Sequence, residues 1–162
     1  MRRGRRSGHL RTGCLSVIFF TDRDLGRIFP QALRDAGLTV ERLDDHFDQD
    51  TDDEVWLSEV GRRGWVAISR NFRIRYQPNE RDAVMRSGTR LFIVIGKVPH
   101  QQLAENFVAT VNKVERFVKN TPAPFIARVY RPSAEQEARG SRKSGRVELW
   151  LSYDQWRKEF DR

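Results

Sequence analysis

The chain has 162 residues, about the size of one domain with short additions, and its 30 Lys and Arg residues against 22 Asp and Glu residues give a net charge of +8. A single cysteine, Cys14, excludes an internal disulfide and a thiolate zinc site, which favours a reducing cytoplasm. No apolar stretch approaches the roughly 20 residues of a membrane span, and the run at 15–20 is shorter than a signal-peptide core. We therefore expect a cytoplasmic protein with no membrane partner.

The charge is unevenly distributed along the chain. Residues 1–14 carry +5 and residues 128–146 carry +4, whereas residues 15–127 sum to zero. Within this neutral body, residues 22–59 carry −8 and residues 60–97 carry +7. A basic protein favours polyanionic partners such as nucleic acid, and here the acids and bases of the body lie on different segments.

Apolar runs alternate with amphipathic segments along the chain. Residues 1–14 have no apolar period and are predicted to form a mobile basic arm. Short apolar runs predict strands, and amphipathic segments bounded by Pro, acids or Gly predict helices. In chain order, the predicted elements are a strand at 15–20, a helix that begins near Pro30 and ends at Gly37, a strand at 39–43, a helix that begins in a capping box at 51–54 (TDDE) and ends at Gly64, a strand at 65–69, a helix from Pro78 to Gly88, a strand at 91–95, a helix at 101–119, and strands at 125–131 and 146–152.

This alternation predicts an α/β fold, a three-layer sandwich with a mainly parallel sheet of four to five strands and a C-terminal β-hairpin extension. The polar segment at 132–146, between the last two strands, is predicted to be disordered. The chain is thus divided into an arm at 1–14, an α/β domain at 15–127 and an extension at 128–162.

The last predicted strand alternates between two faces. Val147, Leu149 and Leu151 are expected on one face and Trp150 on the other. An exposed Trp150 would mark a partner surface or a homodimer surface. The alternative is a hairpin that packs on the domain.

Acidic and amide side chains follow the ends of the predicted strands or open a helix that leads into one. Ligands of an open parallel sheet bind outside the carboxyl ends of its strands, so these side chains are expected to converge. Gathered carboxylates repel one another unless a cation is present, and carboxylate oxygens are preferred ligands of Mg²⁺ and Mn²⁺. Taken singly, each acid is also explained as a turn residue or a helix-dipole partner. The set is Asp22, Asp24, Asp44, Asp45, Asp53 and Asn71.

Two segments resemble PIN domains. The segment DEVWLSEVGRRGWVAISRNF at 53–72 is similar to the PIN signature, in which an Asp-headed helix runs into a strand that ends T-R-D. The segment FFTDRDLG at 19–26 resembles the first strand of the PIN-like group. The likeness covers about residues 15–97, and the longer pattern resembles the PIN-like VapC-type toxins. It implies a metal-dependent endoribonuclease, usually the toxin of a toxin–antitoxin pair, with RNA and a cognate antitoxin as partners.

The resemblance also implies roles for particular residues. Asp22 matches the first-strand acid and Asp53 the helix-opening acid, and Asp45 is the candidate for the acid expected between them, with Asp44 next. Asn71 stands where the motif has an aspartate, so the catalytic positions are Asp22, Asp53 and Asn71. An amide oxygen can ligate Mg²⁺ but carries no charge, which weakens the expected site. The implied ligands of Mg²⁺ or Mn²⁺ are Asp22, Asp24, Asp45, Asp53 and Asn71.

RNA contacts are expected on the basic segment. Aromatic and arginine residues alternate at 72–76, a pattern that suits single-stranded RNA through stacking on bases and contacts to phosphates. The alternative is a solvated loop whose arginines pair with the acidic segment. The expected RNA contacts are Arg23, Arg70, Arg73 and Arg75.

Asn71 leaves two alternatives to an active nuclease open. The first is a PIN-like module that keeps an RNA-binding or interaction surface and has lost its chemistry. The second is a phosphoacceptor receiver domain, suggested by the acid pair after the first strand and by Lys97 after the fourth. Asn71 cannot accept phosphate, which argues against that second alternative.

Overall fold

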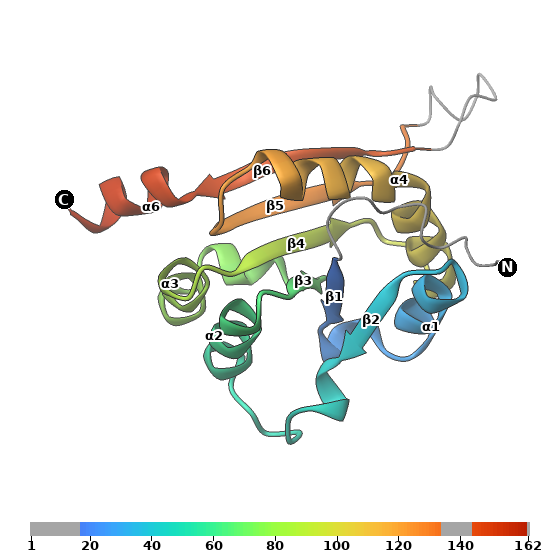
Figure 1. The fold of residues 1–162 in the computed structure, drawn as a ribbon, viewed down its shortest axis with the longest axis horizontal. Helices are drawn as coiled ribbons and strands as arrows, with labels where there is room; N and C mark the ends of the chain where they lie inside the picture. Colours follow the sequence, from blue (N-terminus) through green and yellow to red (C-terminus); the bar gives the residue numbers. More distant parts are fainter. Residues whose placement is uncertain (1–16, 134–143, 162) are drawn as a thin grey trace, which may run out of the picture.

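The computed structural model describes residues 17–133 and 144–161 (Figure 1). The predicted arm at 1–14 lies outside the described residues, as does most of the segment at 132–146. No helix in the described part of the chain is long and apolar enough to cross a membrane.

Six strands form one sheet, in the order β2-β1-β3-β4-β5-β6. The strands are β1 (Ile18–Thr21), β2 (Thr39–Arg42), β3 (Val66–Ser69), β4 (Arg90–Ile95), β5 (Phe125–Tyr130) and β6 (Arg146–Ser152). Strands β1 to β5 pair in parallel, and β6 runs antiparallel to β5. The predicted mainly parallel α/β fold with a C-terminal hairpin is confirmed, and the hairpin strand β6 joins the same sheet.

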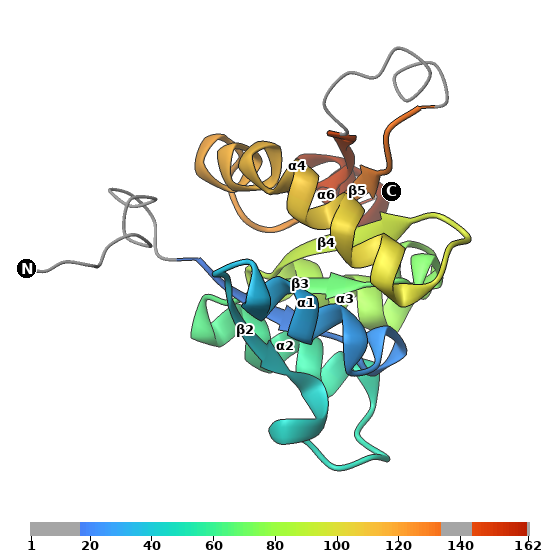
Figure 2. The same cartoon turned by 90° about the vertical axis from the view of Figure 1, so that its right-hand side faces the viewer.

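Helices cover both faces of this sheet (Figure 2). They are α1 (Ile28–Asp35), α2 (Asp53–Arg63), α3 (Pro78–Arg86), α4 (His100–Asn120) and α6 (Tyr153–Phe160). Helices α1 and α4 pack together over one face, whereas α2 and α3 pack together over the other. Each pair of consecutive parallel strands is joined through a helix, as a parallel connection requires.

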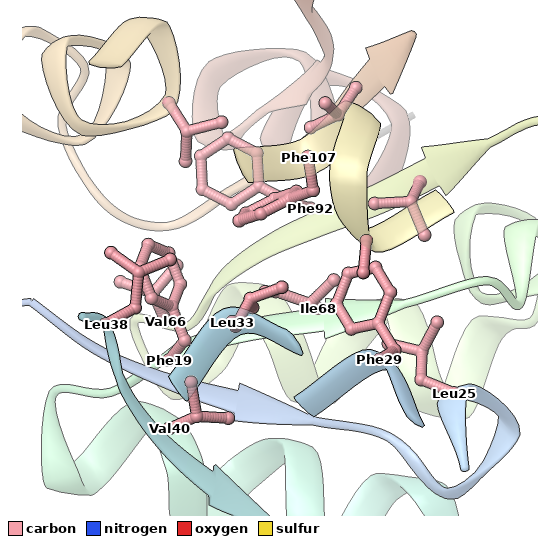
Figure 3. Packing of buried hydrophobic residues seen from close by; sticks show 14 of the residues in the cluster. Phe19, Leu25, Phe29, Leu33, Leu38, Val40, Val66, Ile68, Phe92 and Phe107 are labelled. Atoms are coloured by element: carbon pink, nitrogen blue, oxygen red, sulfur yellow. The ribbon is translucent and has the colours of Figure 1, made fainter. Parts of the chain in front are cut away.

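Successive residues of β1 anchor the two apolar layers. Phe19 meets Phe107 of α4 edge-on, with 5.6 Å between ring centroids (Figure 3). On the opposite face, Phe20 stacks on Trp56 of α2, also at 5.6 Å. All four rings are buried. Because β1 is held from both sides, the position of the residue that follows it, Asp22, is fixed.

The predicted capping box at 51–54 is wrong. Asp52 caps α2, its side chain makes no capping hydrogen bond, and the helix begins at Asp53. The Asp53 carboxylate instead accepts a hydrogen bond from the indole N–H of Trp56 at 2.9 Å. Trp56 is fully buried, and its N–H needs a partner there, so core packing decides how this helix begins.

The predicted alternation in β6 is also wrong, because the pairing of β5 with β6 contains a bulge. Leu149 pairs with Ala127 and Leu151 pairs with Ile126, which leaves Trp150 as the extra residue. Trp150 and Leu151 consequently pack on the same apolar cluster, on the α2 and α3 side, while Leu149 is exposed. The hairpin therefore packs on the domain.

Helix α6 is absent from the sequence-based prediction, although the sequence carries its signal. The Ser152 hydroxyl accepts the N–H of Gln155 at 3.1 Å, and the Ser152 N–H donates to the Gln155 side chain at 2.8 Å, a capping box. The buried Trp156 donates its indole N–H to Asp82 of α3 at 2.8 Å. This contact ties the C-terminal extension to α3.

Gly61 lies within α2, where alanine normally stabilises a helix by about 1 kcal/mol relative to glycine. Here a Cβ would overlap the Thr89 hydroxyl and approach the Ser87 carbonyl oxygen to 2.5 Å. Thr89 is buried and donates to the Leu57 carbonyl at 2.8 Å, so it has little room to move. We expect Gly61→Ala to lower the free energy of unfolding by about 1–3 kcal/mol, measured by urea denaturation.

Ser58→Ala on the same helix is the control, because Ser58 is only partly buried and its hydroxyl donates to the Glu54 carbonyl of its own helix. It should be neutral or slightly stabilising. A Gly61→Ala protein as stable as this control would contradict the close approach of α2 to the turn before β4.

Candidate active site

The carboxyl ends of β1 and β3 lie side by side in the sheet. From β1 the chain passes to β2 on one side, and it then returns to β3 on the other side of β1. Open α/β sheets bind their ligands at such a reversal of strand order. The N–H of Asp22 donates to the Ile68 carbonyl at 2.9 Å, which places Asp22 beside Ser69 at the end of β3.

Asp22 is a nearly buried carboxylate, only 8% exposed. The buried Ser69 hydroxyl donates to its Oδ2 at 2.7 Å, and the N–H of Arg23 donates to its Oδ1 at 2.6 Å. The Ser69 oxygen also accepts the N–H of Asn71 at 2.9 Å. One hydroxyl thus links the ends of β1 and β3 and orients Asp22.

Asp24 places a second carboxylate against the same turn. The residue is exposed, yet its carboxylate accepts the N–H of Arg70 at 3.1 Å and has a longer contact, 3.4 Å, with the Ser69 hydroxyl. Loss of solvent around this carboxylate raises the pKa of Asp24, against the stabilising effect of these hydrogen bonds. The structure therefore brings Asp22 and Asp24 together around Ser69.

The surroundings of Asp22 raise the pKa of its carboxyl group. Burial raises it from 3.8 to about 7, with a further contribution from the negative charge of Asp24 and a smaller one from Asp53. The hydrogen bonds from Ser69 and from the Arg23 backbone oppose the increase. Without a cation, Asp22 is consequently close to half protonated near neutral pH.

Asp53 and Glu80 add acidic groups from α2 and α3. The charge of Asp53 contributes to the raised pKa of Asp22, Asp24 and Glu80, so Asp53 lies within electrostatic range of all three. Burial is the largest cause of the raised pKa of Glu80. Sequence reasoning missed Glu80, although the signal was present: Pro78 opens a helix directly after the turn that follows β3, at the carboxyl edge.

Asn71 occupies the turn after β3 but uses its amide oxygen locally. Its Oδ1 accepts the N–H of Arg73 at 3.1 Å and caps the 3-10 turn Phe72–Arg75. An aspartate could make the same bond, because it has an oxygen in the same place. The difference between Asn71 and the aspartate of the motif is therefore one of charge.

The structure places Asp44 and Asp45 in a separate group of ion pairs. The Asp44 carboxylate lies 2.6 Å from the Arg23 guanidinium and 3.6 Å from that of Arg42, and Asp45 lies 3.3 Å from Arg42. Both acids are exposed. Arg23, an expected RNA contact, also donates to the Asp48 carbonyl at 3.2 Å, so its guanidinium is held by the acidic segment.

The other expected RNA contacts lie around the turn after β3. Arg70 donates to the Gly96 carbonyl at 2.9 Å, Arg73 is exposed, and Arg75 lies 3.9 Å from Glu159 of α6. Arg70 also interacts favourably with the Asp24 carboxylate. Arg70 thus has partners both directly after β4 and on the acidic segment, whereas Arg75 has its partner on α6.

Comparison with known proteins identifies the family of this site. The model of the PIN-like domain family matches residues 17–96, which contain β1 to β4 and the acids Asp22, Asp24, Asp44, Asp45, Asp53 and Glu80. The protein named "Putative ribonuclease VapC45", from Mycobacterium tuberculosis, is 32% identical over 117 residues, covering 68% of this chain and 84% of that protein. This chain belongs to the PIN-like domain family. No solved structure matches it significantly.

PIN-like membership implies a divalent cation, which would need carboxylate ligands at this edge of the sheet. Within the described residues, no three His, Cys, Asp or Glu side chains already form a metal-binding group. Mg²⁺, however, usually keeps several waters and takes only one or two protein carboxylates together with substrate phosphates. Asp22 and Asp24, which share Ser69 and repel one another, fit that requirement.

The raised pKa of Asp22 predicts how the stability of this PIN-like domain depends on pH. Between pH 3.8 and about 7 the folded state holds a proton that the unfolded state has lost, so stability falls as pH rises through this window. Asp22→Asn removes the titrating carboxyl group and with it this loss of stability. In EDTA, we expect this variant to melt at least about 4 °C above wild type at pH 8 and to approach wild type near pH 4, in thermal melts. A difference that stays constant with pH would contradict the burial of this carboxylate.

Proposed function

We propose that this PIN-like protein is a divalent-cation-dependent endoribonuclease, the toxin of a toxin–antitoxin pair. One observation carries the proposal: a nearly buried carboxylate, Asp22, lies beside Asp24 at the reversal of strand order, with a pKa raised to about 7. The likeness to a relative named as a ribonuclease supports the choice of RNA. We propose Mg²⁺ or Mn²⁺ as the cofactor, because both prefer carboxylate oxygens.

The proposed cation would be held by Asp22 and Asp24, with Asp53 in support. Bound there, it would activate a water for attack on the phosphodiester and stabilise the developing negative charge. The side chains have separate tasks. Asp22 would act as a ligand in its deprotonated form, and the Ser69 hydroxyl keeps its Oδ2 oriented. Asp53 adds negative charge that favours the cation, while its carboxylate is held by the Trp56 indole.

Asn71 need not abolish this chemistry. Asp24 supplies a second carboxylate beside Asp22, and Asp53 and Glu80 add further negative charge. An aspartate at position 71 would retain the turn and add still more charge next to Ser69. We therefore propose an active but weakened site, in which Asn71 is a minor ligand or none.

We propose RNA as the substrate and an antitoxin as the protein partner. Arg70 precedes Asn71 and Arg73 follows it by two residues, and we propose that both attract RNA phosphates toward the carboxylates. Arg23 and Asp45, which are engaged in ion pairs of their own, have a smaller part in the proposal. A toxin must be restrained, so we also propose a cognate antitoxin as a cytoplasmic partner.

Cleavage of a fluorophore-labelled single-stranded RNA with Mg²⁺ or Mn²⁺ tests the proposal. Wild type should cleave and EDTA should stop cleavage. Asp22→Asn should lower the rate at least about 100-fold, because it removes the charge of the central ligand. Asn71→Asp should raise the rate at limiting metal concentration.

Asp45→Asn is the matched control, because it removes one carboxylate of the acidic segment that pairs with Arg42. It should retain activity, whereas Asp53→Asn should lose most of it. An equal loss of cleavage in both variants would indicate that Asp45 also belongs to the site. Inactivity of both wild type and Asn71→Asp would reject the nuclease.

The neutral Asn71 favours one other function, a PIN-like RNA-binding module without chemistry. This candidate predicts RNA affinity that persists in EDTA and a purified protein that cleaves nothing. The cleavage assay separates it from the nuclease, because wild type would then cleave nothing in Mg²⁺ or Mn²⁺, whatever the activity of Asn71→Asp.

A further inference from the structure

A continuous row of aromatic rings and arginines runs from the turn after β3 across the β5–β6 hairpin. The Tyr76 ring meets Trp150 edge-on, with 5.8 Å between centroids. The Arg128 guanidinium lies 4.5 Å from the centroid of Trp150 and 5.7 Å from that of Tyr130, and Arg146 lies 4.1 Å from the Tyr130 ring. We call these five residues the aromatic row.

Both ends of the aromatic row lie at the edge of the sheet that carries the carboxylates. Tyr76 closes the 3-10 turn that Asn71 caps. At the other end, Tyr130 and Arg146 pair with one another at the carboxyl end of β5, next to Ile95 at the end of β4. The row therefore extends from the candidate active site along the neighbouring surface.

Core packing explains only part of the aromatic row. Trp150 is half-buried and contacts the apolar cluster on the α2 and α3 side. Tyr76, in contrast, is 61% exposed, and the side chain of Arg146 is 64% exposed. An exposed tyrosine and an exposed arginine at the two ends of one ordered row indicate a binding surface.

The charges in the aromatic row favour a polyanion. Glu148 accepts a hydrogen bond from Arg128 at 2.6 Å and one from the Tyr130 hydroxyl at 3.2 Å, which holds both side chains in place. Arg146 lies 3.9 Å from the same carboxylate and is exposed. Two arginines against one acid leave a positive surface beside flat aromatic faces.

We propose that the aromatic row binds the single-stranded RNA that extends beyond the cleaved phosphodiester. Bases stack on the Tyr76 and Trp150 rings, and phosphates contact Arg146 and Arg128, a combination typical of proteins that bind single strands without sequence preference. The inference rests on the proposed ribonuclease function, which it extends from the site of cleavage to the path of the substrate.

Fluorescence anisotropy tests this path, with a fluorescein-labelled oligouridine of about 12 nucleotides in EDTA, where no cleavage occurs. Tyr76→Ala should weaken binding about tenfold through the loss of one stacked base. Arg146→Ala should weaken it severalfold and reduce the dependence of binding on salt. Trp150→Phe should bind more tightly than Trp150→Leu.

Two matched controls lie at the opposite edge of the sheet. Arg62 is as exposed as Arg146, at 63%, and likewise pairs with a glutamate. Tyr153, 39% exposed, follows the far end of β6. Arg62→Ala and Tyr153→Ala should bind RNA as wild type does. The proposal would be overturned if the variants of the aromatic row lost no more affinity for RNA than the controls. It would also be overturned if they lost antitoxin binding and kept RNA binding.

The binding assay also separates this proposal from the nuclease itself. Asp22→Asn should keep its affinity for the RNA in EDTA and lose cleavage. Tyr76→Ala should instead raise the KM for cleavage and leave kcat nearly unchanged. If wild type binds the RNA through the aromatic row but never cleaves it, the nuclease fails and the binding surface stands. A wild type that does not bind the RNA overturns the aromatic row as its path.

Discussion

The burial of one carboxylate, Asp22, is the constraint on which the rest of the site depends. Its charged form is disfavoured by loss of solvent and by its neighbours Asp24 and Asp53. The fold tolerates it because the Ser69 hydroxyl and the Arg23 N–H donate to its two oxygens. A carboxyl group in this environment favours its protonated form, and a divalent cation can stabilise the charged form by replacing the proton.

The apolar layers explain why this arrangement keeps its geometry. Phe19 and Phe20 hold β1 from opposite faces, so Asp22 cannot retreat from its neighbours. Trp56 connects the same core to the site directly, since its ring stacks on Phe20 and its N–H binds Asp53. The strand that anchors the core, β1, therefore also leads into the site, and the stability of the core holds the repelling carboxylates in place.

Much of the fold and part of the candidate site could be predicted from the sequence. Alternating apolar and amphipathic segments predicted the sheet, and the strand ends located Asp22 and Asp24. The sequence could not tell that Asp45 pairs with Arg42, because that depends on how the chain folds after β2. The bulge at Trp150 could not be predicted either, since it depends on how β5 pairs with β6. Glu80 was missed although Pro78 marks the helix that carries it.

Calorimetric titration of Mn²⁺ into the protein at pH 7, in two buffers with different heats of ionisation, tests whether a cation displaces the proton of Asp22. We expect Mn²⁺ to bind wild type and to release protons from Asp22, because the cation replaces the proton that the raised pKa retains. Asp22→Asn should bind Mn²⁺ more weakly and without this release. Equal binding and equal proton release in the two proteins, or no binding by wild type, would show that Asp22 is not a cation ligand.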